Sequence, residues 1–569
     1  MKVCVVGAGP CGLTTIKQLL DEGHEVVCFD KNSDVGGLWL RHEDDAGQMK
    51  AYDDLMLTIS MKLMAYSDYP FTGGRVFYTR AAYLGYLQEY AARFDLTRHI
   101  RFGSEVTDVR RDGDGWTVTV RRDGVESSET FGAVAICSGP FKTPNTSIPE
   151  IEGFTGEVVH SADYRNSDRF RGKRVLIVGL AESGADIVRQ IGNAADACTL
   201  AIRSYTYLLP RMHDNKSTDQ GTVRAHHHEM CRRATDQPFA LGTFWGRNPV
   251  SKAAFHAAAI VYGIAMTAIG SVRVRLNRLP GRRKSVPDVN VMGQPYLPAK
   301  IDIDTLDNAE NWDMIRTWNR RSHPDGSWAQ RGIFSKNVSF IPGIVSGAIT
   351  LNDAGVVGAE GSTVRFGDDT AAEFDTIVLC TGFTTEKLSI GDLQVKDGNV
   401  RNLWKHFLHP EHDGTAAFIG FVRPFSGGIP ISAEMQARYF ALLCSGKKRP
   451  PANIDELIGR EKEWEEYWTA LSPRHPESIP SQALYLDGLA REVGCLPSVR
   501  YLVLRPRLFV RLWFGSFNPS GYRIVGPHNR GAGALEDLYS EPFDDRRDIT
   551  LHMPLRQLLP SSVHPEHAM

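Results

Sequence analysis

The sequence lacks both a strong net charge and any cysteine pair with motif spacing. Its 65 Lys and Arg residues nearly balance its 67 Asp and Glu residues, which leaves a formal net charge of −2. A chain of this charge has no bulk electrostatic attraction to nucleic acid, so we expect no nucleic-acid partner. Its nine cysteines include no CxxC or CxxxxC motif, which argues against a disulfide reductase and favours buried, reduced thiols.

Long hydrophobic runs are scarce as well. Residues 253–272 are almost uncharged and numerous enough to cross a bilayer, but they are rich in Ala and Gly and poor in Leu and Phe. We interpret this stretch as a buried or amphipathic helix. A strand pattern begins at Lys2, and residues 560–565 are polar, so we expect a cytoplasmic protein without a signal peptide or a transmembrane anchor. The sequence leaves open whether the protein forms a homodimer.

One histidine run invites a metal interpretation. His226, His227 and His228 are adjacent, and Glu229 follows them. Adjacent histidines in a loop rarely converge on one ion, and no Cys/His spacing typical of zinc surrounds them. We therefore expect no metal site.

The first of two glycine-rich turns is the most informative feature that the sequence does contain. It follows an apolar run at residues 3–6 and has the spacing GxGxxG through Gly7, Gly9 and Gly12. In such a turn the first glycine permits the sharp bend, the second lets a pyrophosphate approach, and the third lets the next helix pack closely. A second strand pattern ends in Asp30, whose carboxylate would accept hydrogen bonds from a ribose. This order predicts a dinucleotide-binding unit.

A second turn of the same kind follows the apolar run 175–178. It carries Gly179, Ala181 and Gly184 at the three glycine positions. Ala181 adds a methyl group where the backbone should approach a phosphate, and Glu182 adds a negative charge beside it. Two units of this kind in one chain predict two dinucleotides held face to face, the arrangement that passes a hydride from a nicotinamide to a flavin.

The second unit carries a cation where the first carries an acid. Its next strand pattern, residues 199–202, ends in Arg203. A cation at this point pairs with a 2′-phosphate, whereas an acid would repel it, so the sequence favours NADPH over NADH. Arg211 is a second candidate for the same phosphate.

Two further motifs connect the chain with a known family. Asp30 and Lys31 are followed by GGLW at residues 36–39, and residues 154–164 read FxGxxxHxxxY around His160. Both resemble motifs of the flavin-containing monooxygenases, a family of class B flavoprotein monooxygenases. The resemblance implies that the first turn binds FAD and the second binds NADPH. It also implies that His160 is a linker residue that couples cofactor position to domain movement.

The resemblance extends along most of the chain and supplies the remaining candidates. Residues 379–383, Leu-Cys-Thr-Gly-Phe, resemble the family's turn at which the chain has returned to the FAD domain, and we expect residues 375–379 to form a strand of the FAD sheet. The residues that we expect to bind the two cofactors are Gly7, Gly9, Pro10, Gly12, Asp30, Lys31, Gly37, Leu38, Trp39, Val106, Ser138, Gly179, Ser183, Gly184, Arg203, Arg211, Thr381, Gly382 and Gln436.

One departure from the family concerns the active site itself. The family has an active-site Asn shortly before a Ser-Asp-Phe-Pro segment. This chain has Ser-Asp-Tyr-Pro at residues 67–70 but no Asn at the matching position. Thr58 and Ser60 are the nearest hydroxyl groups, and we take them as the candidates that replace the Asn.

The motifs predict an α/β fold with two Rossmann-like domains, the NADPH domain inserted into the FAD domain. We expect the FAD domain to span residues 1–165 and 336–445. The NADPH domain would span 170–335, with a helical insertion at about 212–330. Residues 446–569 would form a mainly helical cap and tail. A chain of 569 residues is long enough for two or three domains.

The resemblance implies a reaction class but leaves alternatives open. NADPH would reduce FAD, O2 would add to the reduced flavin at C4a, and a nucleophilic N or S atom of a small molecule would take the oxygen. Baeyer–Villiger oxidation of a ketone is the first alternative; that reaction usually needs an Arg at the peroxide, and we can assign no residue to this task. The second alternative is an uncoupled NADPH oxidase or flavin redox protein, which the missing Asn would favour.

Overall fold

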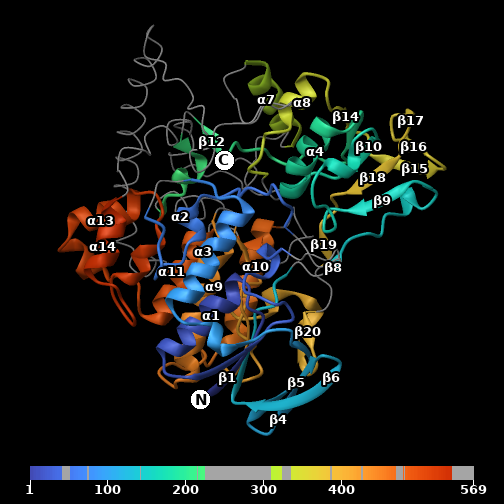
Figure 1. Ribbon diagram of the computed structural model, residues 1–569. Coiled ribbons are helices and arrows are strands. Elements are labelled where there is room, and N and C mark those ends of the chain that lie inside the picture. The colour runs from blue at the N-terminus through green and yellow to red at the C-terminus, as the bar shows by residue number, and fades with distance from the viewer. Residues whose placement is uncertain are drawn as a thin grey trace.

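Two five-stranded parallel β-sheets organise the protein, each at the centre of an α/β unit (Figure 1). We call the unit built on strand β1 the first unit and the unit built on strand β10 the second unit. The computed structural model describes residues 1–41, 51–72, 76–140, 143–213, 216–224, 309–322, 335–384, 388–424, 427–469, 478–479 and 481–540.

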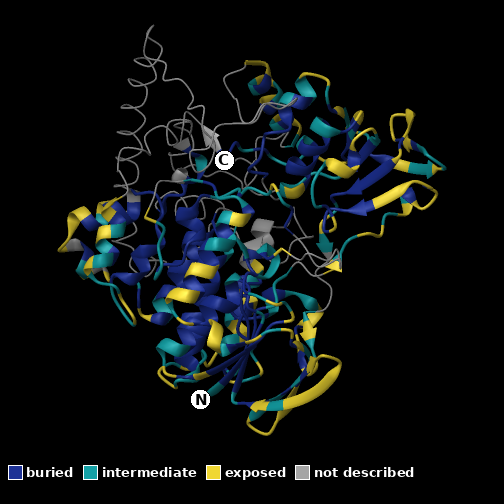
Figure 2. Cartoon of the chain, in the orientation of Figure 1, coloured by how far each residue is buried: buried dark blue, intermediate teal, exposed yellow. Residues whose placement is uncertain are grey.

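The sheet of the first unit has the strand order β22-β7-β1-β2-β3. These strands are β1 (Lys2–Val6), β2 (Glu25–Phe29), β3 (Ile100–Arg101), β7 (Ala133–Ile136) and β22 (Ala416–Phe418), and every pair is parallel. Their apolar side chains are buried on both faces, as a covered parallel sheet requires (Figure 2).

Helices cover one face of the first sheet, and a small antiparallel sheet covers the other. The core of the helical face includes residues of α1 (Pro10–Asp21), α3 (Arg80–Arg93), α9 (Ile429–Cys444) and α11 (Gln482–Val493). Helix α9 is buried along nearly its whole length (Figure 2). The opposite face packs against the three-stranded sheet β4 (Glu105–Asp112), β5 (Gly115–Arg122) and β6 (Val125–Phe131).

The sheet of the second unit repeats this plan with the order β14-β11-β10-β18-β9. Its strands are β9 (Glu157–His160), β10 (Arg174–Val178), β11 (Ala197–Ala201), β14 (Thr350–Asn352) and β18 (Thr376–Leu379), again all parallel. The central strand of each sheet, β1 or β10, leads into a glycine turn and then a helix.

As in the first unit, helices pack on one face of the second sheet and a small antiparallel sheet packs on the other. Helices α4 (Glu182–Ala194), α7 (Ala309–Ser322) and α8 (Ile341–Val345) contribute to the core on one face. The antiparallel strands β15 (Val356–Glu360), β16 (Thr363–Phe366) and β17 (Ala371–Glu373) cover the other.

The strand pairing corrects one prediction from the sequence. We expected residues 375–379 to form a strand of the first sheet and residues up to 165 to belong to the first domain. Instead β18 pairs with β10 on one side and with β9 on the other, so both β9 and β18 lie in the second sheet. A buried parallel strand is an apolar run in either sheet, so its pattern does not tell which sheet it joins.

The chain crosses between the units through two short strands. β8 (Thr143–Pro144) and β19 (Phe383–Thr384) form an antiparallel pair. All strands of the second sheet lie between β7 and β22 in the sequence, so the second unit is inserted into the first, as predicted. The remaining domain boundaries stay predictions, and the helical insertion expected at about 212–330 lies mostly outside the described residues.

The C-terminal region is mainly helical, as the sequence predicts. It contains α10 (Ile454–Thr469), α11, α12 (Val499–Val503), α13 (Pro506–Phe514) and α14 (Ala532–Ser540). The short elements elsewhere are α2 (Met61–Met64), β12 (Met212–His213), β13 (Lys216–Ser217), β20 (Ser389–Ile390), β21 (Leu393–Gln394), β23 (Arg423–Pro424) and β24 (Ser478–Ile479).

The structure bears on two expectations from the sequence, namely reduced cysteines and no membrane-spanning helix. Every cysteine in the described part of the chain is a free thiol, and all but Cys444 are buried. No helix within the described segments is long and apolar enough to cross a membrane, while residues 253–272 lie outside them.

Candidate active site

The first glycine turn brings its predicted residues into contact with one another. Gly7 follows β1 with φ +101°, and a Cβ atom there would lie 2.9 Å from the Cys137 carbonyl oxygen. A Cβ atom on Gly12 would lie 1.8 Å from the Gly7 carbonyl oxygen, so helix α1 packs directly on the turn. Helix α1 begins at Pro10, and its N-cap residue, Gly9, has no side-chain cap. The N–H groups of its first turn are therefore left for an anion.

The next strand and the loop after it close on the same turn. Asp30, at the end of β2, accepts a 2.5 Å hydrogen bond from the Ala8 N–H group through Oδ2. A Cβ atom on Gly37 would lie 2.9 Å from Gly9 Cα, so the short helix Gly37–Trp39 lies against the turn. The two backbone segments approach so closely that a side chain at Gly37 would collide with Gly9. The arrangement matches a site for a pyrophosphate and a ribose.

The second turn has the same local geometry. Gly179 has φ +94°, and a Cβ atom there would lie 2.9 Å from the Cys380 carbonyl oxygen, as for the first turn. Helix α4 begins at Glu182, and its N-cap residue Ala181 has no side-chain cap. The helix packs less tightly, because a Cβ atom on Gly184 would lie 2.9 Å from the Gly179 carbonyl oxygen. Both turns therefore offer a helix N-terminus to an anion.

The two arginines proposed for the 2′-phosphate have different surroundings. The side chain of Arg203 follows β11 and is 67% exposed, with Nη1 3.6 Å from Glu150 Oε1. The side chain of Arg211 is buried, with Nη2 3.7 Å from Asp186 Oδ1 and 3.5 Å from the Met56 carbonyl oxygen. The Arg203 side chain is thus open to solvent, and its role at a phosphate stays a prediction. The buried contacts of Arg211 do not support it as a ligand of the same phosphate.

Replacing the exposed arginine tests this difference. Arg203→Ala is expected to raise the KM for NADPH about tenfold, because one charge-assisted hydrogen bond is worth about 1.5 kcal/mol. The KM for NADH should stay the same, since NADH has no 2′-phosphate. Arg365, on β16, is also an exposed arginine of the second unit, and Arg365→Ala serves as the control. An unchanged ratio of the two KM values in Arg203→Ala would reject this role.

His160 lies where the chain crosses between the units. Its Nδ1 accepts a 3.0 Å hydrogen bond from the Ala162 N–H group, and its Nε2 lies 3.0 Å from the Gly382 carbonyl oxygen. Because Nδ1 is the acceptor, Nε2 carries the proton and donates it to that carbonyl. Thr381 Oγ1 in turn donates to the Asn145 carbonyl oxygen at 2.5 Å. These contacts join the two crossing segments, which supports His160 as a linker residue rather than a proton carrier.

The location of Thr381 and Gly382 differs from the prediction. They were expected in a turn at which the chain has returned to the first unit. They follow β18, which is a strand of the second sheet, and lead into the crossing strand β19. They therefore belong to the link between the units, and the chain rejoins the first sheet only at β22.

The other predicted ligands vary in how well they fit. Ser138 follows β7 beside the first turn, and its Oγ is buried without a hydrogen-bond partner, as expected of a group that meets a ligand. Val106 lies in β4 and packs against the core of the first unit. Lys31 and Ser183 are exposed. Their roles stay predictions.

Gln436 does not fit a ligand role. It is fully buried in α9. Its Oε1 accepts a 2.9 Å hydrogen bond from the Gly420 N–H group, and its Nε2 donates to Tyr485 Oη at 2.6 Å. Both ends of the amide are thus bound within the protein, so its environment is structural.

The two candidates for the missing Asn lie on the loop of the first unit that contacts the second. The Ser60 N–H group donates a 2.7 Å hydrogen bond to Asp219 Oδ2. Ser60 is fully buried, yet its Oγ has no hydrogen-bond partner. Thr58 is partly exposed. An unsatisfied buried hydroxyl group is costly, so Ser60 is the better candidate for a group that meets a ligand.

The same loop is joined to the second unit at a buried carboxylate. Tyr52 Oη donates a 2.7 Å hydrogen bond to Asp186 Oδ2, and Asn337 Nδ2 donates to Asp186 Oδ1 at 3.0 Å. Asp186 lies in α4, directly behind the second turn. The second turn and the loop of Ser60 therefore share one hydrogen-bonded network.

Glu182, at the start of α4, is held by a backbone group of a distant segment. Its Oε1 accepts a 3.2 Å hydrogen bond from the Lys336 N–H group. Burial raises the pKa of Glu182, while this hydrogen bond and the Lys336 cation lower it. The Glu182 carboxyl group is thus held by the segment that contains Lys336.

Lys336 belongs to the same group of polar residues. Its side chain is 7% exposed. Burial lowers the pKa of Lys336, and the Asp219 and Glu182 carboxylates oppose this change. We call Ser60, Glu182, Asp219 and Lys336 the interunit cluster.

Comparison with known proteins agrees with this geometry. The family model described as flavin-binding monooxygenase-like matches residues 1–242 and 323–540. The chain is 33% identical to a 4-hydroxybenzoate brominase (decarboxylating) of Pseudoalteromonas luteoviolacea, over 95% of this chain and 93% of that protein. It is 26% identical to the N-oxide-forming dimethylaniline monooxygenase 2 of Macaca mulatta, over 99% of this chain and 95% of that protein. The solved S-allyl-L-cysteine S-oxygenase of Allium sativum superposes with a TM-score of 0.56 at 20% identity, over 95% of this chain and 99% of that one.

The chain belongs to the flavin-binding monooxygenase-like family. It is an FAD-dependent monooxygenase that takes its electrons from NADPH. Two dinucleotide units whose sheets repeat each other are what this chemistry requires, since the flavin and the nicotinamide must meet.

No metal site is seen in the part of the family fold that the structure describes. Within those residues, no three His, Cys, Asp or Glu side chains gather as ligands. The run His226–His228 lies outside them.

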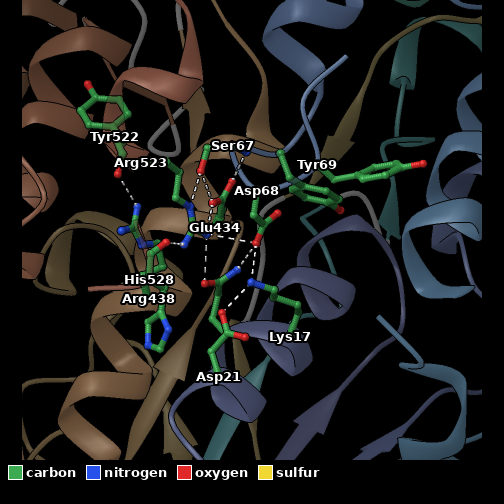
Figure 3. A network of polar contacts seen from close by, with 12 residues as sticks. Lys17, Asp21, Ser67, Asp68, Tyr69, Glu434, Arg438, Tyr522, Arg523 and His528 are labelled. Carbon is green, nitrogen blue, oxygen red and sulfur yellow. Dashed lines mark hydrogen bonds and ion pairs between the residues drawn. The ribbon is translucent and has the colours of Figure 1, made fainter. Parts of the chain in front are cut away.

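A buried arginine holds the first unit of this monooxygenase together (Figure 3). Arg523 Nε donates to Ser67 Oγ at 2.8 Å, and its Nη2 donates to Asp68 Oδ2 at 3.0 Å and to Glu434 Oε1 at 2.6 Å. Its Nη1 donates to the His528 carbonyl oxygen at 3.0 Å. The C-terminal region is thus tied to α9 and to the segment that follows the loop of Ser60.

The same network reaches the helix of the first turn. Lys17, in α1, lies 2.9 Å from Asp68 Oδ2 and 2.5 Å from Asp21 Oδ2. Burial by itself raises the pKa of Asp68, but the Arg523 and Lys17 cations outweigh it and lower that pKa to about 2. Asp68 is therefore a carboxylate at every pH at which the enzyme would work.

Sequence reasoning missed most residues of these networks. Among them are Tyr52, Asp186, Asp219, Lys336 and Arg523, each of which joins segments far apart in the chain. Nothing in the local sequence pattern of these residues marks their contacts.

Proposed function

We propose that this monooxygenase uses NADPH and O2 to oxidise a small nucleophilic molecule at the interunit cluster. The observation that carries the proposal is the buried, unpartnered Ser60 hydroxyl, on a loop of the first unit that is hydrogen-bonded to the helix behind the second turn. A buried hydroxyl group without a protein partner is free to donate a hydrogen bond to a bound ligand.

The chain offers a specific set of groups to each cofactor. Gly7, Gly9 and Gly12 would admit the FAD pyrophosphate to the N-terminus of α1, and Asp30 would accept a ribose hydroxyl group. Arg203 would pair with the NADPH 2′-phosphate. Bound together, FAD and NADPH supply hydride transfer and the activation of O2.

The protein itself supplies burial and hydrogen bonds. Tyr52, Asp186 and Asn337 hold the loop of Ser60 against the second unit through buried hydrogen bonds. A closed contact of this kind excludes water from the space where the two rings would meet, and exclusion of water limits loss of electrons to hydrogen peroxide.

Two nucleophiles are the main candidates. Oxygenation of N or S is the first, and it is supported by the N-oxide-forming relative. A phenol ring is the second, because the chain is more similar to a 4-hydroxybenzoate brominase, 33% against 26%. Baeyer–Villiger oxidation, which usually needs an arginine at the peroxide, has no comparable support. The Arg211 side chain is buried and contacts Asp186 and the Met56 carbonyl oxygen.

Turnover under labelled oxygen tests the proposal. Purified enzyme with NADPH and ¹⁸O2 is offered dimethylaniline, a thioether, cyclohexanone, or 4-hydroxybenzoate with and without bromide. We expect one substrate class to raise NADPH consumption, to lower the yield of hydrogen peroxide, and to give a product that carries ¹⁸O or bromine. Consumption of NADPH with full recovery as hydrogen peroxide in every mixture would contradict the proposal in favour of an NADPH oxidase.

The Ser60 hydroxyl has its own test. Ser60→Ala is expected to raise the fraction of NADPH that ends as hydrogen peroxide roughly fivefold, the value of one hydrogen bond of about 1 kcal/mol. It should also raise the free energy of unfolding slightly, because an unsatisfied buried group is removed. Ser520 Oγ is likewise buried without a partner, so Ser520→Ala should give the second effect without the first. Equal peroxide yields in Ser60→Ala and wild type would remove Ser60 from the site.

A further inference from the structure

Residues 216–224, which we call the strap, run from the second unit to the C-terminal region. The strap begins with β13, which pairs with β12. Its Asp219 accepts a 2.7 Å hydrogen bond from the Ser60 N–H group through Oδ2. Val223 then forms an antiparallel bridge with Ser516. One segment of the second unit therefore contacts both the loop of Ser60 and the C-terminal region.

A buried ion pair, which we call the clamp, fixes the far end of the strap. Arg224 Nε lies 2.9 Å from Asp487 Oδ2 and 3.2 Å from Oδ1, and Arg224 Nη1 donates a 2.9 Å hydrogen bond to the Leu512 carbonyl oxygen. Tyr522 Oη donates to Asp487 Oδ1 at 2.6 Å. The Arg224 and Asp487 side chains are 6% and 0% exposed. Removal of the arginine would leave the buried Asp487 carboxylate without this cation, so the clamp holds the strap firmly.

The turn before the clamp fixes the Asp219 side chain. Residues Thr218–Gly221 form a short 3₁₀ helix. Ser217 Oγ donates a hydrogen bond to Asp219 Oδ1, and the Thr222 N–H group donates to the Asp219 carbonyl oxygen at 3.0 Å. The Asp219 carboxylate is therefore held by the strap itself, and its position depends on where the strap lies.

The loop of Ser60 depends on the strap at one position. Its flanking residues Leu57 and Met61 donate backbone hydrogen bonds of 2.8 Å to the Tyr78 and Val76 carbonyl oxygens of the first unit. The Ser60 N–H group, which lies between them, donates to the strap instead. Loss of the strap would therefore leave both flanks of the loop in place but release the Ser60 backbone, and with it the buried hydroxyl group.

We infer that Arg224 and Asp219 are positioning residues, which hold the loop of Ser60 in place through the strap. Both act on the reaction through Ser60 rather than by contact with the substrate. The inference rests on the proposed function and adds a control on it. While the clamp holds, the loop stays against the second unit and keeps water out of the space where the two cofactor rings would meet. Release of the strap admits water, so more of the electrons from NADPH end as hydrogen peroxide.

Hydrogen exchange measured by mass spectrometry tests the inference on the FAD-loaded, full-length protein. In Arg224→Met and in Asp219→Ala the peptide that contains Ser60 is expected to exchange at least about tenfold faster than in wild type, as loss of a charge-assisted hydrogen bond would give. Arg438→Met is the matched control, because this buried arginine donates to two carbonyl oxygens of the C-terminal region rather than to the strap (Figure 3). Its Ser60 peptide should exchange as in wild type.

The yield of hydrogen peroxide tests the effect on the reaction. During turnover of a substrate found by the labelled-oxygen assay, Arg224→Met and Asp219→Ala should each raise the fraction of NADPH that ends as hydrogen peroxide roughly fivefold, as for Ser60→Ala, and leave the KM for NADPH unchanged. The double variant should match the single ones, because both substitutions break the same path. Arg224→Lys should have a smaller effect than Arg224→Met, because an ammonium group can pair with Asp487 but cannot reproduce all the guanidinium hydrogen bonds.

The outcomes that overturn the inference are distinct from failure of the proposed function. Wild-type exchange of the Ser60 peptide in Arg224→Met, wild-type peroxide yield in both strap variants, or equal effects in Arg438→Met would each overturn it. If Arg224→Met does not fold, Arg224→Lys and Asp219→Ala decide in the same way. If wild type returns all NADPH as hydrogen peroxide with every substrate, the proposed function fails, whatever the exchange of the Ser60 peptide.

Discussion

Gly12→Ala is expected to purify without FAD. The added Cβ atom would lie 1.8 Å from the Gly7 carbonyl oxygen, far inside van der Waals contact, and a backbone atom of a tight turn cannot move aside cheaply. Either α1 shifts away from β1 or the turn deforms, and in both cases the N–H groups at the start of the helix leave the pyrophosphate. Loss of two charge-assisted hydrogen bonds, about 1.5 kcal/mol each, weakens FAD binding by a hundredfold or more.

The ratio of flavin to protein absorbance and a titration with FAD measure this effect. Gly85→Ala is the matched control, because Gly85 lies in α3 and a Cβ atom there meets nothing within 4 Å. This variant should keep FAD and gain up to about 1 kcal/mol of helix stability. Gly184→Ala, with its wider 2.9 Å approach, should keep FAD and weaken NADPH binding. A yellow, fully loaded Gly12→Ala enzyme would refute the assignment of the first turn.

Arg523→Met is expected to destabilise the first unit by about 3–5 kcal/mol, because it leaves the buried Glu434 carboxylate without the Arg523 cation and leaves Asp68 with Lys17 alone. Asp68 and Glu434 are 6% and 0% exposed, so water does not replace the lost contacts. The apparent midpoint of thermal unfolding should fall on the order of 10 °C. FAD retention should fall as well, since the network reaches α1 through Lys17.

A surface arginine with similar partners provides the control. Arg174 contacts Glu373 and Asp375 but is exposed, so Arg174→Met should change the midpoint little. Arg523→Lys should recover only part of the loss, because an ammonium group cannot reproduce the fork of guanidinium hydrogen bonds. If Arg523→Met melts with wild type, the network does not stabilise the unit as described.

The network also predicts how stability depends on pH. In the folded protein the pKa of Asp68 is about 2, below its value of about 3.9 in an unfolded chain. A lowered folded-state pKa contributes stability that is complete above the unfolded value and is lost as pH falls toward 2. Wild type should therefore lose stability between about pH 4 and pH 2 more steeply than Arg523→Met.

The sequence predicted what is local in the chain. Gly7, Gly9, Gly12 and Asp30 lie within one strand-turn-helix-strand unit, and the backbone geometry that each glycine requires can be inferred from spacing alone. The second turn and Arg203 follow the same logic. The two cofactors and the inserted order of the units were predicted because both follow from this pair of turns and from the resemblance that their neighbouring motifs carry.

What depends on contacts between distant segments was not predicted. Ser60 and Asp219 are 159 residues apart, and Glu182 and Lys336 are 154 residues apart. No periodicity or motif relates such positions, so the interunit cluster emerged only from the fold. The prediction that β18 belongs to the first sheet was wrong for a related reason. The sequence of an apolar strand does not indicate which strands it pairs with.

Stopped-flow absorbance of the NADPH-reduced enzyme mixed with oxygenated buffer, without substrate, tests the central claim most directly. The account predicts a spectrum that is neither that of oxidised nor that of reduced flavin, which lasts longer with NADP⁺ bound and disappears faster when a nucleophilic substrate is added. Direct return to the oxidised spectrum, with one hydrogen peroxide released for each NADPH and no effect of any substrate, would contradict it.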